Sequence, residues 1–595
     1  MKSYDERTQN IRAKLSAKRR QRRKSLTAAI SMVCCIVLIA GVITTIPAEE
    51  SPLTSTIPST EPLGRDYTSL TKALRNIRYK TPTNDVPLLD FAPGADLEGI
   101  GPSLGPTDGD TEITDNQVSG VTEADIINRS NEYIFYLHDD ALKIYSIAGV
   151  DSAEVGSYDL TKTMQCKEMF LSEDYSTITI IGPSRTAKTL YIINLDVTDP
   201  LNVKEIGRMA LSGQYQSARF TDGSLYLFTS YHVPYNCDLD NPATFLPLYG
   251  TEDNMTGLLM DDIVICRDPQ YAVYSVVTEL DPVTLEMKDT LALLGYGGQL
   301  YVSQSNIYLT RSTNITMVIG NTVINQSATE ICRIRYIGDK LEVTGCMEIE
   351  GTVKDQYSLD EKDGILRVVT TVRGSTGINQ SFGDSSVTNI TDSYLNASLY
   401  CVDFDNGKVI AKAEKFAPDG EQVQSVRFDG DKAYVCTSIQ LSDPVFCFDL
   451  SDLSNITWVD TGTIDGFSSS LVELGNGFLL GIGRGSSWNT VKIEVYREGQ
   501  TAMEPYCSYE ADNAYISTDY KAYYIDRSNQ FVGLGISSFN GHVYSTNYLL
   551  LHFDGTQLIQ KVMMPLEGEV TEMRGVCVDG WLYMLGEEFK VAPIE

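Results

Sequence analysis

The chain has 595 residues, and its 79 Asp and Glu residues outnumber its 47 Lys and Arg residues, which gives a formal net charge of −32. A protein this acidic repels the phosphate backbone of nucleic acids, so we expect no nucleic-acid partner. The length is enough for several domains, unless a repeated architecture takes most of the chain as one unit.

The N-terminus separates into a basic and an apolar segment. Residues 1–25 contain ten Lys or Arg residues and two acidic residues, so this segment carries +8 and the remainder carries −40. Residues 26–46 are 21 residues without a charge. A helix of that length, at about 1.5 Å per residue, spans the roughly 30 Å of a bilayer core. We therefore expect a transmembrane signal anchor at 26–46.

The one-sided position of the basic segment predicts the topology of this anchor. The N-terminus is expected in the cytoplasm and everything after the span outside the cell, with the cytoplasmic membrane as a partner. The alternative is a cleaved signal peptide. Its apolar core would be long, however, and Ile46-Pro47-Ala48 does not supply the small residue expected before a cleavage site. We favour the uncleaved anchor and a cell-membrane location.

Residues 47–114 are predicted to be a linker, because most of this segment is rich in Pro, Gly, Ser, Thr and Asp. The stretch 66–79 differs from its surroundings and is expected to form a short helix, since apolar residues recur at helical spacing. Its apolar face consists of Leu70, Ala73, Leu74 and Ile77.

Two stretches of the remaining chain are nearly alike. Residues 216–230 read QSARFTDGSLYLFTS, and residues 424–438 read QSVRFDGDKAYVCTS. Each predicts a strand with a central Arg, a turn of Asp and Gly, and an aromatic strand, which is a repeated hairpin. Short alternating strands continue from about Val118 to the end of the chain. The sequence therefore predicts an all-β fold, a single β-propeller over 115–595, preceded by one N-terminal transmembrane helix.

The strand pattern divides this domain into units of four antiparallel strands. The units are expected to begin near residues 121, 164, 215, 297, 355, 421, 467 and 512. A three-stranded remnant at 571–594 either completes a blade with N-terminal residues or forms one more blade. We therefore predict eight blades, with seven and nine as the alternatives.

Two acidic turns follow apolar strands. NLDVTDPLN (194–202) and FDLSDLSN (448–455) are expected to use Asp196 with Thr198, and Asp449 with Ser451, as side-chain caps of backbone amides. The alternative is calcium binding, but the ligands are too sparse for a calcium loop. No metal site is predicted.

The twelve cysteines divide at the predicted span, and ten of them lie beyond it, where disulfides persist. Cys332 and Cys346 flank the expected turn at 338–340 symmetrically, so we expect them to face each other across two strands. Cys436 and Cys447 are expected to do the same. The alternative, of equal weight, is that these residues are small buried apolar side chains. No paired CxxC motif indicates a zinc site.

Several stretches of the domain are typical of one family. They are NQVSGVTEADIINRSNEYIFYL (116–137), YQSARFTDGSLYL, EQVQSVRFDGDKAYV followed by DPVFCFDLSD, and DGFSSSLVELGNGFLLGIG. They resemble bacterial secreted or membrane-anchored proteins with a C-terminal β-propeller domain, which are distantly WD-repeat-like. The resemblance covers nearly all of 115–595 and implies architecture and location, but no activity. Thr122 stands where an acid is expected, which weakens an acid-cluster role for Glu123 and Asp125.

Catalytic signatures are scarce. The four histidines form no HExxH pair, there is no GxSxG motif, and the glycine run at 481–485 is not followed by a helix. We therefore predict no catalytic residue and no cofactor. A hydrolase that uses two of the many carboxylates stays open, because the sequence does not select a pair.

Three arginines recur in the innermost strands of their units. They are Arg219, Arg427 and Arg574. Innermost strands line the channel of a propeller, so the three guanidinium groups are a candidate site for an anion or carboxylate ligand. The alternative, which we favour, is that they pair with channel acids and hold neighbouring blades in register. Such acids are Glu123, Asp125 and Glu473.

Long insertions fall at the connection between the second and third strands of several units. They are 230–270, 311–330, 372–397 and 527–547. Connections of one type leave the same face of a propeller, so these loops are expected to crowd together and to carry recognition. Tyr231, His232 and Tyr235 make the first loop a candidate ligand-binding surface. The alternative is tolerated surface insertion.

Together these features favour a membrane-anchored extracellular β-propeller that binds a protein, a peptide or a cell-envelope glycan through its loop face. The alternative function is a cell-envelope hydrolase with carboxylates at the channel mouth. A third hypothesis is a sensor that signals through the span, although 25 cytoplasmic residues leave little room for an output domain. An enzyme needs converging acids or a nucleophile, whereas a binding module needs only a continuous surface.

Overall fold

The computed structural model describes residues 66–80, 116–337, 340–382, 385–439, 442–462, 464–499, 503–539 and 541–594. The predicted signal anchor at 26–46 lies outside these ranges. Within them, no helix is long and apolar enough to cross a membrane. The contacts divide the chain into Met1–Ser55 and Thr56–Glu595, and every described residue belongs to the second unit.

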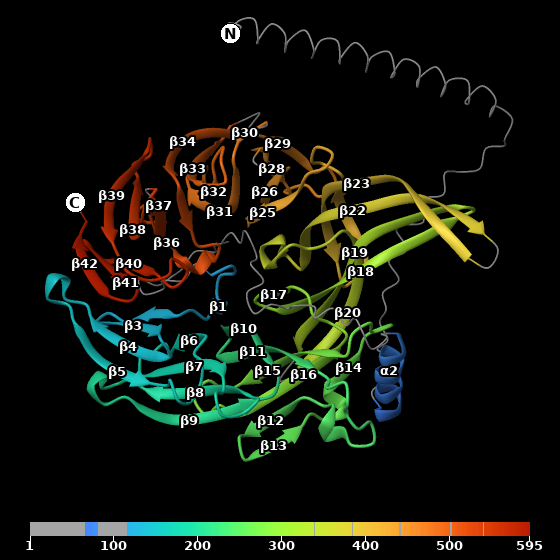
Figure 1. Ribbon diagram of the computed structural model, residues 1–595, viewed down its shortest axis with the longest axis horizontal. Helices are drawn as coiled ribbons and strands as arrows, with labels where there is room; N and C mark the ends of the chain where they lie inside the picture. Colours follow the sequence, from blue (N-terminus) through green and yellow to red (C-terminus); the bar gives the residue numbers. More distant parts are fainter. Residues whose placement is uncertain are drawn as a thin grey trace, which may run out of the picture. The chain divides into compact units, whose positions relative to one another are not determined.

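The second unit consists of antiparallel strand groups that follow one another around a ring (Figure 1). The first group consists of β2 (Ile127–Arg129), β3 (Tyr133–His138), β4 (Ala141–Ser146) and β5 (Glu154–Asp159). The second consists of β6 (Glu168–Leu171), β7 (Thr177–Pro183), β8 (Leu190–Asp196) and β9 (Lys204–Leu211). The third consists of β10 (Gln214–Thr221), β11 (Ser224–His232), β15 (Val273–Leu280) and β16 (Met287–Leu294).

The fourth and fifth groups are joined into one sheet by pairing of β19 with β22. The fourth consists of β17 (Leu300–Val302), β18 (Asn306–Ile319), β19 (Thr322–Ile337) and β20 (Lys340–Glu350). The fifth consists of β21 (Leu359–Lys362), β22 (Ile365–Phe382), β23 (Ser385–Asp403) and β24 (Lys408–Ala413).

The remaining groups complete the ring. The sixth consists of β25 (Gln422–Asp429), β26 (Lys432–Ser438), β28 (Val445–Asp449) and β29 (Thr457–Asp460), beside the short pair β27 (Ser442–Asp443) and β30 (Ile464–Asp465). The seventh consists of β31 (Phe467–Gly475), β32 (Phe478–Arg484), β33 (Thr490–Glu498) and β34 (Met503–Asp512). The eighth consists of β35 (Ala514–Ile516), β36 (Tyr523–Asp526), β37 (Phe531–Phe539), β38 (Tyr544–Phe553) and β39 (Leu558–Pro565). The last consists of β40 (Arg574–Val578), β41 (Trp581–Leu585) and β42 (Phe589–Pro593).

Turns between first and second strands of these groups use a left-handed backbone. In the first repeated hairpin, Asp222 and Gly223 have φ of 48° and 71°. In the seventh group, Asn476 and Gly477 have φ of 56° and 78°. Positive φ at both central residues is typical of the two-residue hairpin turn whose twist matches that of the paired strands, and Asp-Gly and Asn-Gly tolerate it best. The repeated Asp and Gly therefore serve backbone geometry.

The two acidic turns are capped as predicted. The Thr198 hydroxyl donates to Asp196 Oδ1 at 2.7 Å, and the Ser451 hydroxyl donates to Asp449 Oδ1 at 2.6 Å. The backbone N–H of each hydroxyl residue donates to the same oxygen at 3.0 Å. These hydrogen bonds lower the pKa of both carboxyls, because they stabilise the ionised form.

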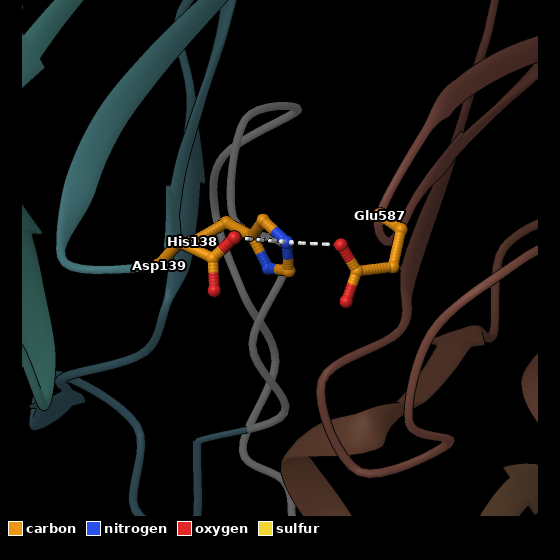
Figure 2. Close-up of side chains that lie close together, drawn as sticks. All are labelled: His138, Asp139 and Glu587. Carbon is orange, nitrogen blue, oxygen red and sulfur yellow. Dashed lines mark hydrogen bonds and ion pairs between the residues drawn. The ribbon is translucent and has the colours of Figure 1, made fainter.

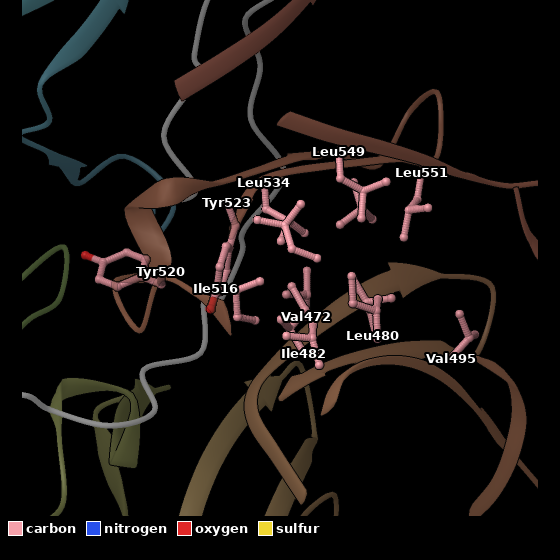
Figure 3. Packing of buried hydrophobic residues seen from close by; sticks show 14 of the residues in the cluster. Val472, Leu480, Ile482, Val495, Ile516, Tyr520, Tyr523, Leu534, Leu549 and Leu551 are labelled. Atoms are coloured by element: carbon pink, nitrogen blue, oxygen red, sulfur yellow. The ribbon is translucent and has the colours of Figure 1, made fainter. Parts of the chain in front are cut away.

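Apolar side chains pack between successive groups and form the core. Figure 3 shows the cluster between the seventh and eighth groups, where Val472, Leu480 and Ile482 face Leu534 and Leu549, all buried. Burial of each such side chain contributes about 1.5–3 kcal/mol. A comparable cluster joins β38 and β41 to β3 of the first group. The ring is therefore closed by side-chain packing between the last and the first strand groups.

The strands β40–β42 form a sheet of their own, and no described N-terminal strand pairs with it. The N-terminal strand β1 (Thr122–Glu123) pairs with β10 instead, with Thr122 opposite Phe220 and Glu123 opposite Arg219. Of the two predicted alternatives for the C-terminal remnant, the structure shows the separate sheet.

The helix α2 (Tyr67–Lys80) follows Asp66, whose carboxylate accepts hydrogen bonds from the Ser69 N–H at 2.9 Å and the Ser69 hydroxyl at 2.8 Å. This N-cap satisfies a helix-terminal amide. Leu70, Leu74 and Ile77 are buried against the segment that links β11 and β15. That segment contains β12 (Leu248–Thr251), β13 (Asn254–Gly257) and β14 (Ile263–Ile265).

The insertions predicted as loops are largely strands. Segment 311–330 is the outer part of the β18–β19 hairpin, and 372–397 is the outer part of the β22–β23 hairpin. The physical reason lies in residues 313–317, where Ile315 and Met317 alternate with Thr and Asn at the period of a strand. Segment 527–547 is mostly occupied by β37 and β38, so the prediction of an expanded loop there is wrong.

The two predicted cysteine pairs have different outcomes. Cys332 and Cys346 are opposite each other on β19 and β20 and form a disulfide, with their Cα atoms 4.1 Å apart. On β26 and β28, Cys436 is opposite Val445 and Cys447 is opposite Tyr434, so the prediction for this pair is wrong. A register offset of two residues separates the thiols, and both are buried in the core between the sixth and seventh groups.

Candidate functional site

A polar network fills the centre of the ring, and the segment 116–125 runs through it. The Gln117 side-chain amide donates to the carbonyls of Gln356 and Leu359 at 2.9 and 3.0 Å. Farther along, the Asp125 and Met169 backbones exchange hydrogen bonds at 2.8 and 3.3 Å. This short segment therefore contacts the second and fifth groups as well as β10, on which β1 lies.

Glu123 is the hub of this network and is buried. Its carboxylate lies 3.3 Å from Arg219 Nη2 and accepts a hydrogen bond from Gln356 Nε2 at 3.2 Å. The Tyr520 hydroxyl donates to its second oxygen. Arg219 in turn donates to Gln356 Oε1 at 2.9 Å and to the Ala218 carbonyl at 2.8 Å. The buried charges are thus compensated by an opposite charge and by hydrogen bonds.

Asp125 links Arg574, the last of the three predicted arginines, to the N-terminal segment. Arg574, on β40, donates two hydrogen bonds to Asp125 Oδ1, from Nη2 at 3.1 Å and from Nε at 3.3 Å. The same guanidinium donates to the Thr571 carbonyl at 2.8 Å. Both side chains are buried, so the last sheet is fixed to the residues just before the first one.

A second charge cluster lies beside this network. Lys521 forms an ion pair with Glu168 and donates to the Ala124 carbonyl at 2.6 Å, and the Tyr215 hydroxyl donates to Glu168. Burial raises the pKa of Tyr215 well above its ordinary value, and the Glu168 carboxylate raises it further. Burial and the Glu123 carboxylate do the same for Tyr520. Both tyrosines are therefore fixed hydrogen-bond donors.

Arg427 occupies the corresponding place on β25 and is fully buried. Its neighbour is Asp360: burial raises the pKa of that carboxyl, while the charges of Arg367 and Arg427 oppose the rise. Arg219 and Arg574 therefore pair with acids of their own, whereas the acid near Arg427 forms its ion pair with Arg367. Of the three acids predicted to pair with these arginines, Glu123 and Asp125 do so. The third, Glu473, has its Oε2 atom 3.9 Å from Arg527 Nε instead.

A pocket of about 230 Å³ opens next to the network, between the third and fourth groups. Its polar lining residues are Gln216, Ser217, Thr229, Ser230, Ser275, Gln299, Asp355, Gln356 and Tyr520. Asp355 is the acid of this lining; burial raises its pKa, and the N–H and hydroxyl of Ser358 each donate to it at 3.1 Å. The lining suits a small polar ligand bound by hydrogen bonds.

The aromatic residues predicted as a ligand surface lie beside the helix α2. Tyr231 packs on Tyr274, with ring centroids 6.2 Å apart, in the cluster that buries α2. Tyr235 is exposed and lies 5.8 Å below the guanidinium of Arg78 from α2. His232, at the end of β11, is exposed. The chain's own helix therefore contacts part of this surface.

The outer parts of β18, β19, β22 and β23 project from the ring (Figure 1). We call the sequence segments 312–329 and 374–391 the arm, of which residues 383 and 384 lie outside the described ranges. The two hairpins join where β19 pairs with β22, from Thr322 opposite Ile378 to Gln326 opposite Gly374. Across both segments Asp384 is the one charged residue, in a chain of which 21% is charged. Val318 and Ile390 are 63% and 70% exposed.

The arm also presents strand edges. Among the described residues, the outer part of β18 pairs only with β19, since its pairing with β17 is limited to three residues. Likewise, the outer half of β23 pairs only with β22. One edge of each strand is therefore exposed. Exposed strand edges normally carry Lys or Pro, which block the addition of another strand. The arm contains neither Lys nor Pro. Its edges are therefore open to an additional strand.

Sequence reasoning missed Gln356, Tyr520, Lys521 and Glu168, which complete the centre of the ring. The pair Glu123 and Tyr520 is separated by 397 residues, and the pair Lys521 and Glu168 by 353. No local motif records contacts at this distance. The one sequence signal that could have indicated these residues was their position, because each lies just before or in the first strand of its unit, the part of a blade nearest the centre of the ring.

A closed ring of antiparallel sheets around a central network defines the class of β-propeller proteins. Residues 112–584 match the family described as Beta propeller domain, and the chain belongs to this family. An uncharacterized protein of Archaeoglobus fulgidus is 23% identical over 561 residues, which covers 80% of this chain and 81% of that protein. An uncharacterized protein of Methanocaldococcus jannaschii is 23% identical over 461 residues, covering 64% of this chain and 66% of that protein.

Solved structures add only distant likenesses. The Dos1 propeller is 11% identical with a TM-score of 0.27, and the match covers 61% of this chain and 72% of that one. An uncharacterized protein from Listeria monocytogenes is 10% identical with a TM-score of 0.29, covering 72% of this chain and 90% of that one. At these scores no argument about function rests on the likeness.

Proposed function

We propose that this protein is a membrane-anchored extracellular binding module whose arm takes up an extended segment of another cell-envelope protein or peptide. One observation carries the proposal: the arm combines open strand edges, exposed apolar residues and a single charge. Strand addition would join backbone hydrogen bonds to side-chain contacts on alternate residues. A glycan ligand is less well supported, because the ring best placed to stack on a sugar, Tyr235 of the first insertion, already lies against Arg78 of α2.

The proposed location rests on residues 1–46. The basic segment at 1–25 and the uncharged 26–46 support a single span with the ring outside the cell. The Cys332–Cys346 disulfide is consistent with an oxidising exterior. Protease digestion of intact cells tests this: the ring should be cut from outside, whereas a tag at residue 1 should be protected until the cells are lysed.

We further propose to count the ring as eight four-stranded blades and one shorter, three-stranded blade, β40–β42, that closes it. The first eight strand groups correspond to the eight predicted units, and the last group shares a core with both of its neighbours. A seven-bladed count would require two of these groups to be merged.

The alternative function is a cell-envelope hydrolase. It has one observation in its favour, which is Asp355 with a raised pKa in a polar pocket. A glycosidase needs two carboxyls on either side of the bond it cleaves, and the lining of this pocket supplies one. The central acids Glu123 and Asp125 are engaged by Arg219 and Arg574. The geometry therefore favours binding over hydrolysis.

The test uses two matched surface variants of the full-length chain. Val318→Lys with Ile390→Lys places two charges on the arm, whereas Leu201→Lys with Val150→Lys places two at sites that are 84% and 76% exposed elsewhere on the ring. Envelope proteins cross-linked to each are identified by mass spectrometry and confirmed by reciprocal capture. A partner lost only with the arm variant supports the proposal. A partner retained by both variants rejects the arm, and glycan or peptide turnover without any partner supports the hydrolase.

A further inference from the structure

A mixed cluster of metal-ligating side chains lies where the ring closes. His138 ends β3, Asp139 opens the turn to β4, and Glu587 lies in the turn between β41 and β42 (Figure 2). His138 and Glu587 are separated by 449 residues, so the cluster joins the first strand group to the last sheet. The ligand atoms of all three residues lie within 4.8 Å of one another.

The two distances from His138 suit ligands of one ion, and the two carboxylates lie within 4.8 Å of each other. His138 Nε2 lies 3.4 Å from Asp139 Oδ2 and 3.3 Å from Glu587 Oε2. Zinc bonds to nitrogen and carboxylate oxygen are about 2.0–2.2 Å long, so two ligands of a tetrahedral ion lie about 3.3–3.5 Å apart. Without an ion, His138 Nε2 is within hydrogen-bond distance of Glu587 Oε2. That contact is longer than the typical value of about 2.9 Å, and one N–H does not point at two carboxylates at once.

The surroundings hold the imidazole in this orientation. The His138 side chain is 2% exposed, while Asp139 and Glu587 are 76% and 53% exposed, so the cluster opens to solvent on one side. The His138 ring stacks on Tyr136 at 5.5 Å, and Tyr136 donates to the Glu572 carbonyl at 2.9 Å. Glu572 Oε2 approaches the other ring nitrogen to 3.8 Å, the side on which outer carboxylates orient metal-bound histidines.

We propose that His138, Asp139 and Glu587 bind one divalent transition ion of the zinc class, with the open side left to water. One imidazole and two carboxylates suit such an ion, whereas calcium takes six to eight oxygen ligands. The bound ion links the β3–β4 turn to the β41–β42 turn. It therefore stabilises the ring at the junction between the two ends of the propeller, where no pairing among the described strands joins them.

The test compares zinc binding by the full-length chain in detergent with that of two neighbouring variants. Glu587→Gln removes one ligand and keeps the side-chain size. Glu588→Gln is the matched control, since Glu588 pairs with Lys590 outside the cluster. Each protein is stripped with EDTA, titrated with ZnCl₂ and then with CaCl₂, and melted in parallel. Bound metal is measured by mass spectrometry.

We expect one zinc per chain and a rise in melting temperature of about 2–4 °C for the wild type and for Glu588→Gln. Glu587→Gln should lose at least tenfold in zinc affinity and show no rise. Replacement by Co²⁺ should give the visible absorption of a tetrahedral ion. Equal zinc responses in both variants would overturn the proposal, and so would a calcium response that matches or exceeds the zinc response. Because Glu587 is half exposed, its substitution leaves the core intact.

Discussion

The centre of the ring and the arm use polar residues in opposite ways. At the centre, Glu123, Asp125, Arg219 and Arg574 are buried, and each carboxylate has a guanidinium partner. Along the arm, exposed Ile and Val lie among uncharged polar residues, and the strand edges are open. The comparison teaches that the buried charges of this protein hold the fold together, whereas the arm, which we propose as the binding surface, is nearly uncharged.

The largest expected effect is on the centre. Arg219→Met leaves Glu123 buried without its guanidinium, and breaking a buried pair in this way costs about 3–5 kcal/mol. Denaturant unfolding of the purified protein measures the change. The control is Arg208→Met, which breaks the half-exposed pair with Glu205, where we expect less than about 1 kcal/mol. Equal losses in the two variants would show that the centre is no more critical than the surface.

The next effect lies at the base of the arm. Replacing Cys332 and Cys346 together with Ala removes the cross-link between β19 and β20, which closes a loop with a sequence separation of 14. Loops of this length contribute about 3 kcal/mol in the chain-entropy account. Thermal unfolding with and without reductant measures this. Reductant should destabilise the wild type and leave the variant unchanged; a variant that still responds would place the sensitive bond elsewhere.

A smaller, pH-dependent effect is expected from Tyr520. Its folded-state pKa lies well above the ordinary value of about 10, because of burial and then the Glu123 carboxylate. Its contribution is therefore fully present below pH 10 and is lost as the pH rises above that value, since the unfolded chain then releases the proton that the folded chain keeps.

Urea unfolding between about pH 8 and pH 11 measures this slope. Tyr520→Phe should cost about 1.5–3 kcal/mol at pH 8, through the lost hydrogen bond to a charged group, and should flatten the alkaline decline. The control Tyr544→Phe changes an exposed ring and should keep the wild-type slope. An unchanged slope in Tyr520→Phe would assign the alkaline loss to the other buried tyrosines.

The smallest expected effect on stability is on the arm. Val318→Lys changes a side chain that is 63% exposed, so the free energy of unfolding should change by less than about 0.5 kcal/mol. Partner capture by the same variant should nevertheless fall. A large loss of stability would mean that the arm is part of the folded core, and the contrast with the centre would not hold.

The sequence predicted those features of the fold that depend on residues close together in the chain. The repeated hairpin at 216–230 and 424–438 and the symmetry of Cys332 and Cys346 about one turn both lie within short windows. The pairing of Cys436 with Cys447 failed, because the connection around Pro444 sets the register at β26 and β28, and spacing does not reveal it. The arm was predicted to consist of loops, because it is rich in Ser, Thr and Asn and the alternation of apolar with polar residues in it is short.

The candidate site was less accessible to sequence reasoning. Arg219 and Arg574 were found because they recur within the repeat, but Tyr520 and Gln356 lie outside any repeated motif. Their roles depend on which strand groups face one another across the ring. That information is carried by the packing of all the groups together, not by any single stretch.

The passage of residues 116–125 through the centre of the ring has a consequence for folding. Glu123 must reach Tyr520, and Asp125 must reach Arg574, over separations of 397 and 449 residues. Contacts so distant in the chain give a high contact order and slow folding. During synthesis Glu123 and Asp125, among the earliest residues of the domain, wait for partners that are made last, and the incomplete ring is exposed to misfolding in the meantime. Timing, and not only stability, therefore limits how this protein reaches its native state.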